Sequence, residues 1–264
     1  MSSEGWRVDD RGGLRVVRCE ALEEITGLAH AFSTRHGNGT GRFDLGSHED
    51  GDADIENRRR RFCDAAGLGE QQPTILHQVH GATVLRAADV NQASSACEAD
   101  GVVAARADQG VPAVRWADCV PLLLADRGGT AVVAAHAGWR GTVRGVVPAA
   151  VRRLRDLGIR PADLRAALGP AIGGCCYEVG EEVITAISQA SGVAAERLVA
   201  RAGRLDLRRA VGLQLQREGL EPSAIHVAPW CTHCSEDLFF SYRREGAGAG
   251  RQMACIGWYR AGQP

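Results

Sequence analysis

Three short apolar runs of this 264-residue chain each begin or end at a histidine or a cysteine. His80 follows the run around Ile75 and Leu76, Cys119 separates two apolar stretches, and His136 closes the run 131–135. Strand ends and the turns after them are places where side chains from distant parts of a chain can converge. Imidazole and thiolate suit zinc or copper rather than magnesium or calcium. The pattern therefore predicts a sheet-based fold with a candidate metal site at its strand ends.

Each of these residues, taken alone, also fits a packing role. A histidine bonded to a backbone carbonyl and an inert core cysteine are common in folded proteins, and the separations are far too long for a zinc-finger pattern. His77 is a competing ligand, three residues before His80. The apolar pattern of Ile75 and Val79 favours a strand, on which His77 and His80 would face opposite sides, so we expect only one of the two to bind.

Strands and helices interleave along the whole sequence. Short runs bounded by Gly, Pro or Asp predict strands at Leu14–Cys19, Leu28–Ser33, Thr74–Leu76, Thr83–Leu85, Gly101–Ala104, Ala113–Trp116, Pro121–Ala125, Thr130–Ala135, Leu164–Leu168, Ala224–Val227 and Gln252–Trp258. Helical spacing predicts helices at Asp54–Ala66, Thr142–Leu157, Glu181–Ser191 and Leu207–Glu218. This order indicates an α/β or α+β fold with a large mixed sheet.

Composition excludes several classes of function. The net charge of −1 gives no support for a nucleic-acid or membrane partner, and no apolar stretch is long enough to span a membrane. The 31 basic residues are all arginines, so Walker, Schiff-base and pyridoxal lysines are absent and only arginine can bind anions such as phosphate. An odd count of nine cysteines, with no apolar leader at the N-terminus, leads us to expect a reduced cytoplasmic protein.

Four of the cysteines form two short motifs. Cys231 and Cys234 make a Cys-x-x-Cys motif, which is half of a structural zinc site, but the other half is missing within normal spacing. We therefore expect a structural turn there, with redox sensitivity as the alternative. Cys175 and Cys176 are adjacent and are not expected to bridge each other, because the disulfide geometry needs more widely separated Cα atoms.

Several segments, in order along nearly the whole chain, resemble one family. They are Phe32–Arg35, Asp44–Gly46, Glu56–Arg58, Leu76–Gly81, Ala117–Leu123, Ala135–Gly141, Gly169–Gly180 and Asp237–Arg244. The family is the purine nucleoside phosphorylase family of the YfiH type, also described as polyphenol oxidase or laccase-domain proteins and as peptidoglycan editing factor. The resemblance implies that residues 1–264 form a single domain, a layered α/β/β/α sandwich with mixed sheets.

The resemblance also implies a zinc ion and a set of reactions. Family zinc ligands correspond to His80, Cys119 and His136, which leaves His77 as the non-ligand. The implied activities are phosphorolysis of adenosine, inosine and methylthioadenosine to free base and ribose 1-phosphate, and deamination of adenosine. The expected partners are therefore a nucleoside and phosphate, and the sequence leaves the oligomeric state open.

The residues themselves support this chemistry in part. Zinc with an open coordination position can activate water for attack on a purine, but the His-x-Glu signature of other zinc deaminases is absent. Asp118 and Asp100 are our candidates for the missing acid. Arg140 lies four residues after His136 and is the first candidate for phosphate binding. Further candidate substrate contacts are Ser33, Arg35, Tyr177, Arg243 and Arg244.

Three other functions compete with this one. A copper-dependent polyphenol oxidase would suit a His₂Cys set, but the chain has eight histidines and no His-x-His pair. A cysteine hydrolase such as a peptidoglycan amidase would use Cys119 and His136 as nucleophile and base. A non-enzymatic scaffold would use the metal only structurally. We expect zinc, with copper as the lesser alternative.

Overall fold

Two sheets form the centre of the protein. The computed structural model describes residues 5–37, 41–46, 53–90, 97–108, 110–201 and 203–259. One sheet is antiparallel and has the strand order β1-β2-β3-β13-β6. Its strands are β1 (Trp6–Arg11), β2 (Leu14–Cys19), β3 (Leu28–Ser33), β13 (Gln252–Trp258) and β6 (Ala113–Trp116).

The second sheet has six strands and is mixed. Its order is β12-β9-β7-β8-β5-β4, with parallel pairs at both edges and antiparallel pairs between them. These strands are β12 (Ile225–Val227), β9 (Leu164–Leu168), β7 (Val120–Asp126), β8 (Ala131–Ala137), β5 (Gly101–Ala105) and β4 (Val84–Arg86). Because β6 and β7 are joined by a three-residue turn, the chain crosses from one sheet to the other at residues 117–119.

The alternation of side chains along the central strands produces the layers. On β7, Leu122 and Leu124 pack toward the helices, whereas Leu123 and Ala125 belong to the core between the two sheets. Strand neighbours point to opposite faces, so a strand that is apolar at every position must be covered on both sides. Trp116 and Phe32, which meet edge to face at 6.1 Å, fill the space between the sheets.

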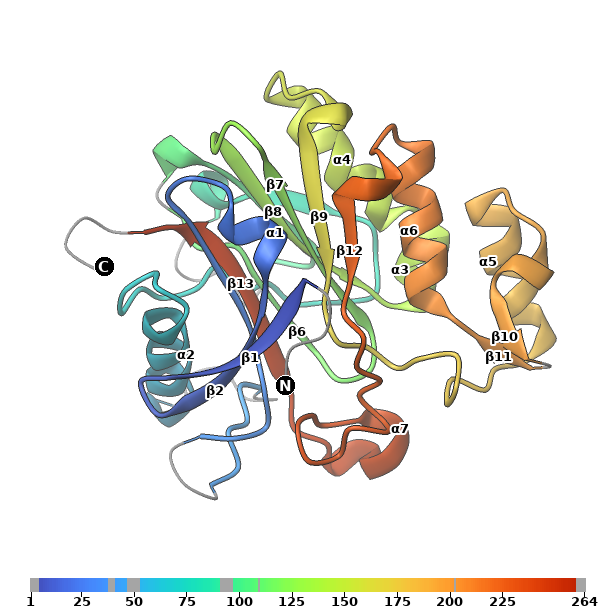
Figure 1. The fold of residues 1–264 in the computed structure, drawn as a ribbon, viewed down its shortest axis with the longest axis horizontal. Coiled ribbons are helices and arrows are strands. Elements are labelled where there is room, and N and C mark those ends of the chain that lie inside the picture. The colour runs from blue at the N-terminus through green and yellow to red at the C-terminus, as the bar shows by residue number, and fades with distance from the viewer. Residues whose placement is uncertain are drawn as a thin grey trace.

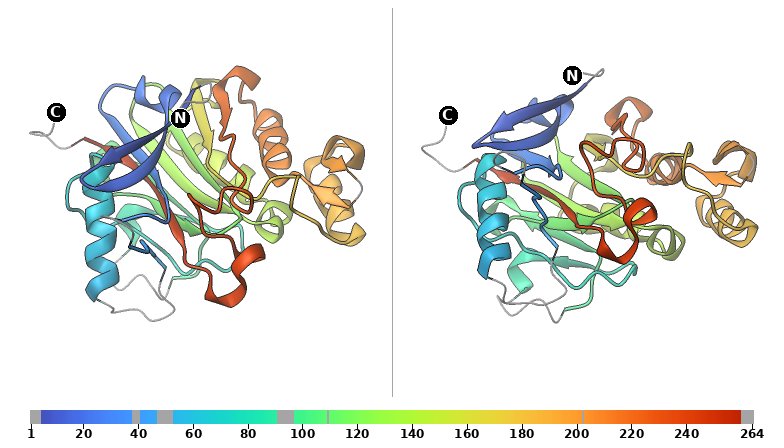
Figure 2. Two further views of the ribbon diagram at one scale, coloured as in Figure 1. Left: turned by 60° about the horizontal axis from the view of Figure 1, so that its bottom comes forward. Right: turned by 90° about the horizontal axis from the view of Figure 1, so that it is seen from below.

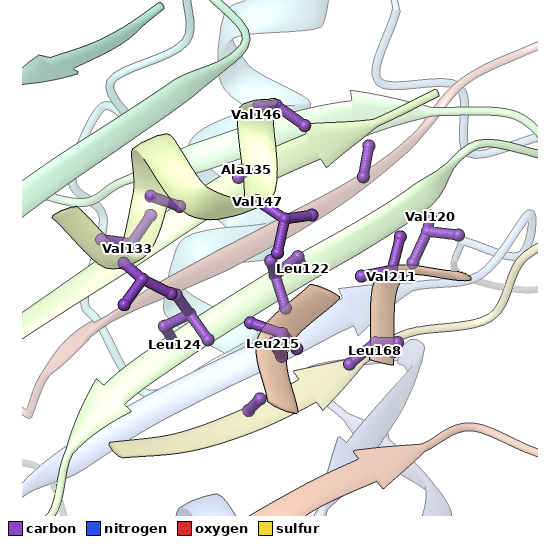
Figure 3. Packing of buried hydrophobic residues seen from close by; sticks show 14 of the residues in the cluster. Val120, Leu122, Leu124, Val133, Ala135, Val146, Val147, Leu168, Val211 and Leu215 are labelled. Carbon is purple, nitrogen blue, oxygen red and sulfur yellow. The ribbon is translucent and has the colours of Figure 1, made fainter. Parts of the chain in front are cut away.

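Helices cover the two outer faces (Figures 1 and 2). The five-stranded sheet carries α2 (Ala53–Ala65), whose Phe62 packs against Val16 and Met253. The six-stranded sheet carries α3 (Trp139–Arg144), α4 (Val146–Asp156) and α6 (Leu207–Arg217), and α5 (Glu181–Ser191) packs outside them against α3 and α6. Figure 3 shows α4 and α6 on β7, β8 and β9. The remaining elements are α1 (Glu20–Glu23), α7 (Tyr242–Glu245), β10 (Val199–Arg201) and β11 (Arg204–Leu205). The predicted layered α/β/β/α sandwich is confirmed, and the six-stranded sheet is the mixed one.

Some expected elements differ from those observed. The single helix predicted at Thr142–Leu157 is two helices, because Gly145 adopts a left-handed φ of 93° and ends α3. The strand predicted at Thr74–Leu76 is only an isolated bridge between Thr74 and Pro112. Among the described residues, no helix is long and apolar enough to cross a membrane.

Candidate active site

Three potential metal ligands meet where the chain passes from one sheet to the other. Cys119 lies in the turn between β6 and β7, His136 lies on β8, and His80 lies in the segment that precedes β4. One donor atom from each residue lies within 4.8 Å of the others. The sheet register explains part of this convergence, because Pro121, two residues after Cys119, pairs with His136.

Two non-glycine residues at the site have left-handed backbones. His80 has a φ of 55° and Asp118, next to Cys119, has a φ of 85°. Such conformations are uncommon outside glycine and cost on the order of 1 kcal/mol or more, so other contacts must hold them. Each of the two residues is held by a buried carboxylate.

Asp100 holds the His80 segment and orients His136. Its side chain is fully buried and accepts hydrogen bonds from the backbone N–H groups of Val79, His80 and Gly81 at 3.1, 3.0 and 2.6 Å. Its Oδ1 also lies 2.8 Å from Nδ1 of His136. Nδ1–H therefore donates to Asp100, which leaves Nε2 of His136 as the nitrogen that can bind a metal once its proton is released.

The charge state of Asp100 follows from the same contacts. Burial by itself raises the pKa of this carboxyl. The hydrogen bond and positive charge of His136, together with the N–H groups of Gly81 and Val79, oppose that effect and leave the pKa below its ordinary value. Asp100 is therefore an ionised acceptor whose oxygens are already occupied.

Asp118 holds the turn that carries Cys119. Its own carboxylate accepts hydrogen bonds from Thr232 Oγ1 at 2.6 Å, Ser241 Oγ at 3.0 Å and the backbone N–H of Arg243 at 2.7 Å. These contacts tie the ligand turn to two segments near the C-terminus. Asp118 lines the cavity, but its oxygens already have three donors.

The thiol and the imidazole stabilise each other's charge. Burial raises the pKa of Cys119, but the adjacent His136 and His80 lower it to about 6. Burial lowers the pKa of His136, whereas Cys119 and Asp100 raise it to about 9. Cys119 is therefore a thiolate near neutral pH, which is the form that binds metals.

The surroundings of the three residues fit a metal ion. Gly138 packs against the cluster, and a Cβ there would lie 2.6 Å from His80 Nδ1 and 3.0 Å from Cys119 Sγ. Two imidazoles and one thiolate suit zinc with one open position, and they also suit copper. Met253 is buried on the α2 side of the five-stranded sheet, so it cannot serve as the axial ligand of a copper site here.

Replacement of Asp100 by asparagine is expected to weaken metal binding by about tenfold to hundredfold, because the amide cannot accept from every donor that now surrounds the carboxylate. Competition with a chromophoric chelator measures the affinity. Asp126→Asn is the matched control, since Asp126 is also buried and accepts from Gly128, Thr130 N and Thr130 Oγ1. Equal affinity in the two variants would contradict the orienting role.

A cavity of about 1360 Å³ opens onto the three ligands. Arginines supply most of its charge, and three acidic residues also reach it. The charged lining residues are Arg59, Arg60, Arg115, Arg140, Arg243, Arg251, Asp44, Glu56 and Asp118. Because Asp118 is already bonded to three donors, the accessible charge of the cavity favours an anionic ligand.

The structure brings some of the predicted substrate contacts into this cavity. Arg140, Tyr177 and Arg243 line it beside the metal ligands. Arg140 lies over the ring of Trp139 at 4.4 Å and, among the described residues, makes no hydrogen bond or ion pair. Arg243 lies over the ring of Tyr177 at 5.3 Å.

Other predicted contacts do not belong to the described lining of the cavity. Ser33 is buried, and its hydroxyl accepts from the backbone N–H of Met253. The guanidinium of Arg35 donates to the carbonyl of Glu236. The guanidinium of Arg244 donates to the carbonyls of Thr232 and Phe239. These three residues support neighbouring segments instead.

Gln78 and Arg115 are cavity residues that the sequence analysis missed. The side-chain amide of Gln78 donates to Arg115 O and accepts from Arg115 N, both at 2.8 Å. It thereby attaches the His80 segment to β6. The sequence does offer one indication of Gln78, because it lies between His77 and His80. The structure puts only His80 in the ligand cluster, while His77 lies elsewhere on the cavity wall.

Known proteins that are similar to this chain indicate its family. Residues 29–259 match a protein family described as multi-copper polyphenol oxidoreductase laccase. A Deinococcus radiodurans protein named purine nucleoside phosphorylase is 37% identical over 250 residues, which cover 93% of each chain. The chain belongs to this laccase-domain family.

Two further proteins are similar to this chain, one in structure and one in sequence. The crystal structure of YlmD from Geobacillus stearothermophilus superposes with a TM-score of 0.81 at 31% identity, and the match covers 97% of this chain and 99% of YlmD. Escherichia coli YfiH, also named purine nucleoside phosphorylase, is 36% identical over 227 residues, or 83% of this chain and 89% of YfiH.

Proposed function

We propose that this chain is a zinc-dependent purine nucleoside phosphorylase that converts adenosine, inosine and methylthioadenosine to free base and ribose 1-phosphate. The observation that carries the proposal is the His80, Cys119 and His136 cluster opening onto an arginine-lined cavity. The names of the curated relatives support the same reaction class. Cytoplasmic location and a single-domain organisation remain predictions from the sequence.

Arg140 and Arg243 are suited to bind the phosphate. A guanidinium presents donors in a planar fork that matches phosphate oxygens, and its charge persists at every physiological pH. Each of these two guanidinium groups stacks on an aromatic ring, Trp139 or Tyr177, which limits the directions in which its donors point. The pair therefore can orient phosphate for attack at C1′ of the ribose.

Tyr177 is suited to contact the nucleoside. Burial, with the nearby Cys119 charge adding to the effect, raises the pKa of this phenol to about 12 despite the opposing charge of Arg243. The hydroxyl therefore stays protonated and can donate a hydrogen bond, while its ring offers a face to the base.

Zinc at His80, Cys119 and His136 would supply a Lewis acid that stabilises developing negative charge. Asp100 keeps His136 in the tautomer that binds, and Asp118 keeps Cys119 in place. We therefore assign both carboxylates as positioning residues rather than as the acids considered from the sequence. Adenosine deamination is a second proposed activity of the same cavity, with its acid unassigned.

The test is the phosphate dependence of base release from inosine. Metal-free protein reloaded with zinc should form hypoxanthine and ribose 1-phosphate only when phosphate is present. Inosine formation from adenosine without phosphate tests deamination separately. Two results would contradict the proposed reaction. One is base release that does not change when phosphate is omitted, and the other is that neither the zinc-loaded nor the metal-free protein turns over inosine.

Removal of the Arg140 guanidinium should weaken phosphate use. We expect Arg140→Ala to raise the KM for phosphate by at least about tenfold, since a hydrogen bond to a charged group contributes about 1.5–3 kcal/mol. The KM for inosine should change less. Arg152→Ala is the matched control, because Arg152 is exposed on α4, outside the described lining of the cavity. Equal phosphate KM values in the two variants would refute the assignment.

A cysteine hydrolase is the second candidate, favoured by one observation. The lowered pKa of Cys119, caused by His136 and His80 against the effect of burial, is what a nucleophilic thiolate needs. Zinc ligation and nucleophilic attack by the same sulfur exclude each other. Turnover that survives chelation but stops on thiol alkylation would favour this candidate, and copper-dependent oxidation of phenols would instead favour the polyphenol oxidase.

A further inference from the structure

A second cluster of potential ligands lies outside the cavity. Cys175 and Cys176 follow β9, and Cys231 and Cys234 follow β12. These two strands are parallel neighbours, so their carboxyl ends meet at one edge of the six-stranded sheet (Figure 1). The pairing continues past the strands through a bridge between Ala171 and Cys231. The fold thereby brings the two cysteine pairs together, although they are more than fifty residues apart in the sequence.

The four sulfur atoms are placed as ligands of one ion. All four lie within 4.8 Å of one another. Cys234 Sγ is 3.6 Å from Cys175 Sγ and 3.3 Å from Cys176 Sγ. Sulfurs about 2.3 Å from a tetrahedral zinc lie about 3.8 Å apart. The four cysteines are free thiols in the structure, and their spacing is close to that of a tetrahedral thiolate site.

Backbone N–H groups already point at one of these sulfurs. Cys231 Sγ accepts from Gly173 N at 3.2 Å, and the N–H groups of His233 and Cys234 also bond to it. The turn after Cys231 therefore stabilises a thiolate at the motif's first cysteine. Gly173 lies close to the cluster, because a Cβ there would lie 3.2 Å from Cys175 Sγ and 2.9 Å from the Arg208 guanidinium.

The local charge suits a metal bound by four thiolates, which carries a net charge of about −2. Arg204 and Arg201 both donate to the carbonyl oxygen of Cys175, the latter at 3.4 Å. Arg208 donates to the carbonyl of Trp230 at 3.4 Å and pairs with Asp206 at 3.3 Å, and Arg204 also lies 3.7 Å from Glu178. Backbone carbonyls of the segments that carry the cysteines thus hold three guanidinium groups, and carboxylates offset part of the positive charge of two of them.

We propose that Cys175, Cys176, Cys231 and Cys234 bind a zinc ion in a closed structural site, separate from the His80, Cys119 and His136 cluster. Four protein ligands leave no open position, so this ion would have no substrate. Its role would be to join the segments after β9 and β12, which are far apart in the sequence. The proposal does not depend on the reaction that the cavity performs.

The site would also support the cavity from outside. Thr232, between two of the proposed ligands, donates to Asp118, the residue before Cys119. Tyr177 directly follows Cys176 and lines the cavity. Loss of the structural ion should therefore reduce activity by displacing Asp118 and Tyr177. The cluster of His80, Cys119 and His136 would keep its own three ligands.

Zinc titration of metal-free, fully reduced protein tests the proposal. With a competing chromophoric chelator, the parent chain should bind about two zinc ions, one for each cluster. Cys234→Ser and Cys175→Ser should each bind about one, and so should Cys119→Ala. Cys97→Ser is the control and should bind about two, because Cys97 is an exposed thiol outside both clusters. The same zinc content in the parent chain, Cys234→Ser and Cys175→Ser would overturn the proposal, whatever number of ions the other cluster binds.

Thiol protection gives a second measurement without any substitution. Zinc should slow iodoacetamide labelling of the four cysteines together, as mapped by peptide mass, and leave Cys97 unprotected. Cobalt added in place of zinc should give a thiolate-to-metal charge-transfer band that largely survives in Cys119→Ala and is strongly reduced in Cys234→Ser, where Cys119 still contributes a thiolate ligand at the other cluster. The site would be refuted if the four cysteines formed disulfides in pairs in air and showed no zinc protection after full reduction.

Discussion

Cys119→Ala is expected to lower phosphorolysis of inosine by about a thousandfold or more, because a catalytic metal contributes several kcal/mol of charge stabilisation. The same variant should bind one zinc fewer than the parent chain. Both losses have one physical cause, since the remaining His80 and His136 provide only two neutral ligands and no thiolate. Steady-state kinetics and zinc content, measured on the same preparation, check the prediction.

The double measurement separates metal ligation from thiolate attack. If Cys119 were a nucleophile in a metal-free site, parent protein stripped of zinc would keep its turnover. A Cys119→Ala chain that keeps full turnover with no metal at this cluster would refute the ligand assignment. Circular dichroism should show an unchanged fold, because Cys119 lies in a turn and is only half-buried.

Gly138→Ala is expected to reduce turnover by about a hundredfold, since a misplacement of about 1 Å at a reacting centre has that effect. The added Cβ would lie 2.6 Å from His80 Nδ1 and 3.0 Å from Cys119 Sγ, closer than packed atoms approach. The backbone of Gly138 has a φ of −75°, which alanine adopts without strain. The effect is therefore displacement of two ligands, and zinc affinity should fall together with turnover.

Gly212→Ala is the control for this substitution. Gly212 lies within α6, and a Cβ there would approach only Ile225, at 3.9 Å. Alanine in a helix interior is favoured over glycine by about 0.5–1 kcal/mol, so this variant should be slightly more stable and fully active. Parent-like zinc affinity and turnover in Gly138→Ala would show that the cluster has more room than its distances indicate.

The two buried carboxylates explain how segments with strained backbones can present the three candidate metal ligands. Asp100 and Asp118 each accept hydrogen bonds from three or more donors. Asp100 binds the segment of His80, which has a left-handed backbone, and Asp118 has a left-handed backbone itself. The hydrogen bonds offset the backbone cost and leave the ligand side chains few other orientations. The site is thus organised by the chain before any metal binds.

The roles of these carboxylates were not visible in the sequence. Both aspartates were identified as site residues from their motifs, but as candidate acids. Their burial and their full sets of donors, which decide that they position other groups, arise only when the segments around residues 80, 136, 232 and 241 meet. Ser33, Arg35 and Arg244 show the same limit, because their polar groups are bonded to backbone atoms instead of the cavity.

Local apolar patterns are enough to predict most of the buried strands and four regions of helix, whereas it is the family resemblance that selects His80, Cys119 and His136 as candidate metal ligands and leaves out His77. Apolar periodicity and strand-end residues are properties of short segments, so no distant contact is needed to recognise them. The tertiary structure alone decided the break at Gly145, the supporting roles of Asp100 and Asp118, and the meeting of Cys175 and Cys176 with Cys231 and Cys234. The last of these depends on the parallel pairing of β9 with β12, which brings together residues that no sequence spacing relates.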